Sequence, residues 1–102
     1  MTSLFVLLWA CAEPRPVEPV LALDGVAGRG EAQFQMVCAQ CHGAGGNGIG
    51  QTPALRGRAH RLTDAELVGA MVNGRGSMRR TRITDAQAAD VLAYVRATFP
   101  EG

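Results

Sequence analysis

The chain has 102 residues, a length that allows one domain whose core is too small to give a wide margin of stability. Domains of this size often complete their interior with a cofactor, a metal ion or disulfides. The ten basic residues are all arginines and stand against nine carboxylates, so the formal charge of +1 gives no sign of a nucleic-acid-binding surface. Three cysteines, an odd number, argue against a closed set of disulfides.

An apolar run opens the sequence at residues 4–10 and is too short to cross a bilayer as a helix. Its length and the small Ala10 at its end fit an export signal. Cys11 follows, and the residues leading into it resemble the lipobox of bacterial lipoprotein signals. The bulky Trp9 departs from that motif, and an ordinary cleaved signal is the alternative. We expect an export signal over 1–10, a periplasmic location and a lipid on Cys11.

Prolines are concentrated in the next segment, residues 12–19. Closely spaced prolines oppose a helix and favour an extended, semi-stiff chain. We therefore predict that 11–26 holds the lipidation site and a tether, and that the folded domain occupies 27–102.

The run Cys38-Ala39-Gln40-Cys41-His42 is a C-x-x-C-H motif, which is typical of covalent haem attachment. In this chemistry two thiols add across the haem vinyl groups and the histidine binds the iron. A C-x-x-C pair also serves thiol redox enzymes and zinc sites. A redox dithiol normally accompanies a βαβ pattern, and no strand pattern follows the motif here. A structural zinc site needs four ligands, and His60 is the one further candidate that the sequence offers. Haem is the favoured interpretation of the three.

A second axial ligand is expected opposite His42, because iron with constant coordination suits electron transfer and a thioether stabilises its ferrous state. Met1 is the initiator, and Met36 lies two residues before Cys38, on the proximal side of the expected haem, where His42 already binds. Met71 belongs to an apolar helical stripe, which indicates core packing. Met78 lies in a loop rich in glycine and arginine and is the favoured ligand, with an adaptable filler as the alternative.

Three helices are predicted, over about 28–38, 64–73 and 85–98, with glycine-rich loops between them and no convincing strand. The second and third follow capping boxes that begin at Thr63 and Thr84. Behind each box, apolar residues recur at helical spacing. The predicted fold class is all-α.

Residues 28–98 resemble the class I cytochromes c, the family of small bacterial mono-haem proteins. The residues that carry the resemblance are Gly30, Phe34, the attachment motif through Gly43, Pro53-Ala54-Leu55, the stretch 73–78 and Ala93-Tyr94-Val95. It implies one covalent haem c inside about three helices, with His42 and Met78 as axial ligands. It also implies that Gly30 packs against Tyr94 where the first and last helices cross.

The resemblance assigns further residues to the haem pocket. It implies that the Pro53 carbonyl accepts a hydrogen bond from the His42 ring, which would orient the imidazole, and that Leu55 packs on the haem. Arg56 and Arg58 suit bidentate contacts to haem propionates, and simple solvation is the alternative.

The expected function is one-electron transfer between exported or membrane-bound redox partners, without enzymatic activity. Positive charge near the expected ligand suits docking to an acidic partner, although a solvated face fits equally well. These arginines are Arg75, Arg79, Arg80 and Arg82. Many relatives have a proline directly after the methionine, so we expect a less restrained loop here. The alternatives are a haem-based ligand sensor or peroxidase-like enzyme with a labile sixth ligand, and a subunit that brings electrons into one dehydrogenase or oxidase.

Overall fold

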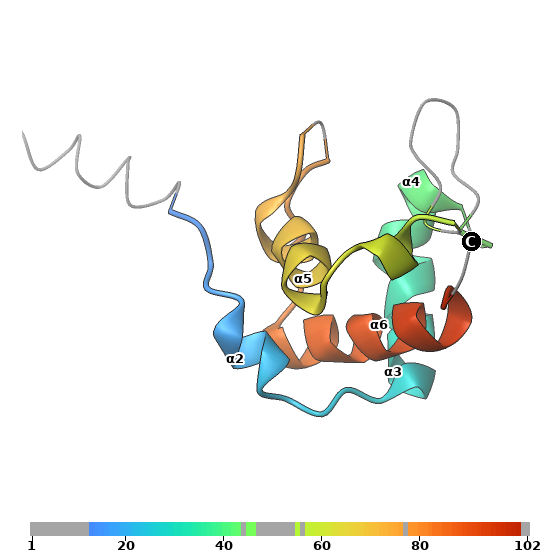
Figure 1. The fold of residues 1–102 in the computed structure, drawn as a ribbon, viewed down its shortest axis with the longest axis horizontal. Helices are drawn as coiled ribbons and strands as arrows, with labels where there is room; N and C mark the ends of the chain where they lie inside the picture. Colours follow the sequence, from blue (N-terminus) through green and yellow to red (C-terminus); the bar gives the residue numbers. More distant parts are fainter. Residues whose placement is uncertain (1–12, 44, 47–54, 56, 77, 101–102) are drawn as a thin grey trace, which may run out of the picture.

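The computed structural model describes residues 13–43, 45–46, 55, 57–76 and 78–100 (Figure 1). Its helical elements are α2 (Glu18–Leu21), α3 (Ala27–Gln33), the π-helical turn η1 (Phe34–Cys38), α4 (Ala39–His42), the 3-10 turn η2 (Ala59–Arg61), α5 (Asp64–Asn73) and α6 (Asp85–Thr98). Within these residues the only β-type pairing is a single bridge between Arg75 and Met78. The all-α prediction is confirmed.

The bounds of α5 and α6 agree with the predicted helices because both predicted capping boxes are formed. The Thr63 hydroxyl accepts the Glu66 N–H at 3.1 Å, and the Glu66 carboxylate accepts the Thr63 N–H at 3.0 Å. Thr84 and Gln87 form the same pair of bonds at 3.1 and 2.9 Å. Each box satisfies two amides that the first turn of a helix otherwise leaves without partners.

Helix α3 continues through η1 into α4, so the first predicted helix is confirmed and extends to His42. It crosses α6 (Figure 1). At the crossing, a Cβ on Gly30 would lie 1.9 Å from the Asp90 carbonyl oxygen and 2.9 Å from the Tyr94 Cβ. The expected packing of Gly30 against Tyr94 is therefore confirmed, and only a residue without a side chain allows this approach.

Asp90 is a buried carboxylate, 8% exposed, that ties the beginning of α3 to α6. It accepts the Val26 N–H at 2.8 Å and the Arg29 Nε at 3.1 Å. The hydrogen bond from the Arg29 guanidinium, and then that from the Val26 amide, hold the pKa of Asp90 below its usual range. Burial is tolerated because the charge is hydrogen-bonded.

The core lies between α3, α5 and α6, and an aromatic cluster closes one end of it. Phe34 and Phe99 are fully buried, with ring centroids 6.0 Å apart, and Tyr94 lies 5.2 Å from Phe34. Burying each phenylalanine contributes about 1.5–3 kcal/mol. The rest of the buried apolar set includes Leu67, Val68, Met71, Val72, Val91 and Val95.

Part of the segment expected to be a tether packs on the domain instead. Pro19 stands in the first turn of α2, where a proline is compatible with a helix because no amide donor is needed there. Val20 of α2 is fully buried, and α2 contacts both α5 and α6. Residues 1–10, where an export signal is expected, and Cys11 lie outside the described residues.

Across the described part of the chain, a membrane-spanning helix is not found, since none is both long and apolar enough.

Candidate functional site

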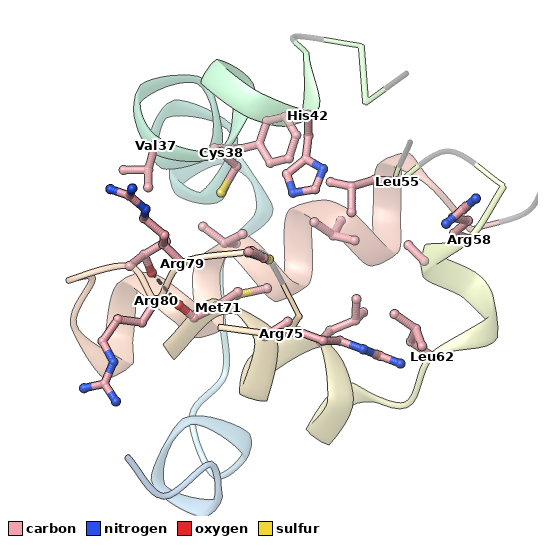
Figure 2. Close-up of a pocket in the computed structure, with 18 of the residues that line it drawn as sticks. Val37, Cys38, His42, Leu55, Arg58, Leu62, Met71, Arg75, Arg79 and Arg80 are labelled. Atoms are coloured by element: carbon pink, nitrogen blue, oxygen red, sulfur yellow. Dashed lines mark hydrogen bonds between the residues drawn. The ribbon is translucent and has the colours of Figure 1, made fainter. Parts of the chain in front are cut away.

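A cavity of about 1030 Å³ lies between the end of the α3–α4 helix, the η2 turn, α5, α6 and the loop after α5 (Figure 2). Small-molecule and cofactor sites are usually about 300–1,000 Å³ and mostly apolar. The inner walls here are apolar and are formed by Phe34, Leu67, Met71, Val91 and Val95. The cavity is therefore large enough for a sizeable cofactor.

The attachment motif forms one wall of this cavity. Cys38 and His42 both line it, and their side chains point into the same space in Figure 2. The amide of Ala39 bonds to the Phe34 carbonyl, which gives the turn before the motif its π-helical width. Because such a turn holds one residue more than an α-helical turn, it rotates the residues that follow it about the helix axis. Phe34 is buried at the inner wall of the cavity, and Cys38 and His42 of the motif line it as well.

Met78 reaches the cavity from the loop after α5. Its backbone pairs with Arg75 in both directions, at 3.0 and 2.9 Å. Thr81 bonds to the Met71 carbonyl through its amide at 2.8 Å and its hydroxyl at 2.7 Å. Gly74 has a φ of +83°, and a Cβ there would lie 2.5 Å from the Met78 carbonyl oxygen. The loop path therefore depends on this glycine.

Two methionines line the cavity, and their surroundings differ. Met71 is 6% exposed and belongs to the buried cluster between the helices, as expected for core packing. Met78 is half-buried and belongs to no helix. Because its side chain is not part of the core cluster, Met78 has the greater freedom to bind a metal.

Several predicted site residues come together at the cavity. Leu55 and Arg58 line the same cavity as His42 (Figure 2). Pro53, Arg56 and the Cys41 side chain lie outside the described residues. Of the four arginines expected to face a partner, Arg75, Arg79 and Arg80 line the cavity, whereas Arg82 is exposed and is not among its lining residues.

Arg96 supports the site but was not predicted from the sequence. From α6 it donates to the Asp64 carboxylate and to the Ala59 carbonyl, each at 2.8 Å, and also to the Leu62 carbonyl. These bonds fix η2, whose residues form part of the cavity wall. In the sequence, Arg96 is a basic residue near a helix end, which does not distinguish it from a solvated arginine.

The cavity residues fit a haem group. An imidazole, a thioether and a thiol face an apolar space, and these are the groups that bind haem iron or attach the porphyrin in c-type proteins. Arg58, Arg61 and Arg75 also line the space and suit carboxylate groups.

Comparisons with known proteins agree with this fit. Residues 25–95 match the family model described as cytochrome c oxidase, cbb3-type, subunit III. A cytochrome c-553-like protein of Synechocystis sp. is 38% identical over 82 residues, which cover 78% of this chain and 76% of that protein. The structure of cytochrome c6 from the diatom Phaeodactylum tricornutum is similar with a TM-score of 0.64 and 30% identity, covering 74% of this chain and 97% of that chain. The chain therefore belongs to the cytochrome c family and is a monohaem c-type cytochrome of the c6/c-553 kind, an electron carrier.

Proposed function

We propose that the cavity holds one haem c, attached through Cys38 and Cys41, with His42 and Met78 as the axial ligands. When bound, the haem supplies an iron that gains or loses one electron. The observation that carries the proposal is that Met78, from the loop after α5, lines the same cavity as Cys38 and His42, which lie four residues apart at the end of the first helix. The protein's own contribution is to attach, orient and enclose the group.

Attachment follows from the spacing of the motif. Residues three and four apart share one face of a helix, so Cys41 and His42 would lie on the same side as Cys38. Each thiol would add across one vinyl group, forming one sulfur–carbon bond and passing its proton to the neighbouring carbon, so that no group leaves. A second covalent bond would prevent the porphyrin from rotating in its pocket.

The remaining pocket residues orient the group. Leu55, which lines the cavity with His42, would pack against the porphyrin, and Pro53 would accept a hydrogen bond from the His42 ring. Arg58, with Arg56, would pair with the propionates. Arg61 and Arg75 extend this set, because both line the same cavity.

Electron exchange requires a partner close to the haem. Arg79 and Arg80 are exposed and line the cavity; Arg75 also lines it, with the Glu66 carboxylate 4.0 Å away. Together with the exposed Arg82, these arginines would attract an acidic redox protein and speed its encounter with the haem edge.

The chain would be exported by residues 1–10 and anchored by a lipid on Cys11. Arg15 bonds to the folded domain, so only the three residues 12–14 separate it from Cys11. Fully extended, the four Cα-to-Cα steps from residue 11 to residue 15 reach no more than about 14 Å. A lipid at Cys11 would therefore hold the domain close to the membrane surface.

Delivery of electrons within a single oxidase is a second candidate role. The observation that favours it is the match to a family model named for a subunit of the cbb3-type oxidase. A dedicated subunit would form a strong, salt-sensitive complex with one enzyme and would not reduce other acceptors.

Covalent attachment is tested by producing the full chain with haem-attachment machinery and measuring the mass of the denatured protein. We expect the mass of the unmodified chain to exceed that of the polypeptide by one haem. The double variant with Cys38→Ala and Cys41→Ala should show no such increase. The matched control is Cys11→Ser, which should keep its haem and lose membrane association. A chain that matures without haem would overturn the proposal.

A further inference from the structure

Arg15 connects both ends of the loop that carries Met78. Its backbone N–H donates to the Asn73 side-chain oxygen at 2.6 Å, and its carbonyl accepts from the Asn73 amide nitrogen at 2.9 Å. Its guanidinium donates to the Ile83 carbonyl at 2.8 Å and to the Asp85 carboxylate at 2.7 Å. Asn73 ends α5 and Asp85 begins α6, so one residue fixes where the loop starts and where it stops.

The position of Arg15 is itself fixed by the domain. It precedes α2, whose Val20 is fully buried against the core. The Arg15 side chain is 31% exposed, so its bonds are partly shielded from water. A guanidinium offers two parallel donors in a rigid fork, which lets it hold a carbonyl and a carboxylate at once. The contact is therefore a defined clamp and not a single surface ion pair.

The loop needs such a restraint at its base. Near its start, Met78 pairs with Arg75, and Thr81 bonds back to Met71. After Met78 the chain continues with Arg79 and Arg80, where a proline would have limited the backbone. Fixing the two ends of a loop reduces the conformations that the intervening residues can reach.

We propose that Arg15 is a positioning residue for Met78: by joining the ends of α5 and α6, it keeps the thioether at the haem iron. This inference rests on the proposed function, in which Met78 is an axial ligand. It assigns the amino-terminal segment a role in the redox site as well as in the link to the membrane.

The test is a titration of the oxidised, haem-loaded full chain with imidazole, which competes with Met78 for the iron. Arg15→Ala removes the charge-assisted hydrogen bonds, whose strength is reduced because they are partly exposed to water. In this variant, imidazole should displace the methionine at a roughly fivefold to tenfold lower concentration. Arg15→Lys keeps the charge without the fork and should give an intermediate value. Asp85→Asn keeps the size of the partner, is expected to shift in the same direction, and provides the test if Arg15→Ala does not fold.

The matched control is Arg29→Ala, which also removes an arginine–aspartate contact to α6 but from α3. It should lower the thermal midpoint without changing the imidazole titration. If Arg15→Ala and Asp85→Asn titrate like the unmodified chain while Met78 is the ligand, the clamp is refuted and the proposed function stands. If the unmodified chain shows no sulfur-to-iron absorption band, the ligand assignment itself fails.

Discussion

Substitution of Gly30 by alanine should destabilise the domain by forcing α3 and α6 apart. The added Cβ would lie 1.9 Å from the Asp90 carbonyl oxygen, whereas real Cβ atoms essentially never approach within 3.0 Å. The obstructing atoms include the α6 backbone, which cannot rotate away as a side chain can. The helices would have to separate by about 1 Å, and packed interiors resist such shifts.

The expected net loss in the free energy of unfolding is about 1–3 kcal/mol, because overpacking outweighs the gain of under about 1 kcal/mol in helix propensity. For a loss near 2 kcal/mol, the thermal midpoint should fall by about 8–16 °C. Gly28→Ala is the matched control, since a Cβ at Gly28 in the same helix has nothing within 4 Å. It should leave the midpoint unchanged or raise it. Equal midpoints for the two variants in thermal unfolding followed by circular dichroism would refute the packing argument.

Two further predictions concern charge. The pKa of Asp90 is held low by Arg29 and Val26, so its contribution to stability is complete above the unfolded-state pKa of about 3.9 and is lost as pH falls through the lower folded-state value. The difference in urea midpoint between the unmodified chain and Asp90→Asn should therefore be constant near neutral pH and shrink below about pH 4; a difference that persists at lower pH would contradict this. Arg79→Gln with Arg80→Gln should slow electron exchange with an acidic partner at low salt, in stopped-flow measurements, and match the unmodified chain at high salt. Equal slowing at both salt concentrations would exclude electrostatic steering.

Local sequence patterns predicted the helices well because the determining interactions are local. The Thr63 and Thr84 boxes join residues only three apart, and they set the beginnings of α5 and α6. The C-x-x-C-H spacing likewise identified a wall of the cavity. The exception was α2, because the prolines that oppose a helix interior are tolerated at its first turn.

Interactions between distant parts of the chain could not be read from the sequence. Arg15 and Asp85 are 70 residues apart, and Arg96 reaches the Leu62 carbonyl across 34 residues. The residues that flank these two arginines in the sequence do not distinguish them from solvated arginines. Their side chains bond to backbone carbonyls and to aspartates, which no sequence motif identifies as partners. The π-helical turn before the motif was also not predicted, since no residue pattern distinguishes it from an ordinary helix.

Ligation of the haem iron by Met78 is tested most directly by the oxidised absorption spectrum of the haem-loaded chain. We expect a weak sulfur-to-iron band near the red end of the spectrum in the unmodified protein. Met71→Leu, which changes the other cavity methionine, should keep the band. Met78→Ala should lose it, lower the reduction potential and bind carbon monoxide when reduced. A band that survives in Met78→Ala, or that disappears in Met71→Leu, would contradict the assignment of Met78 as the axial ligand.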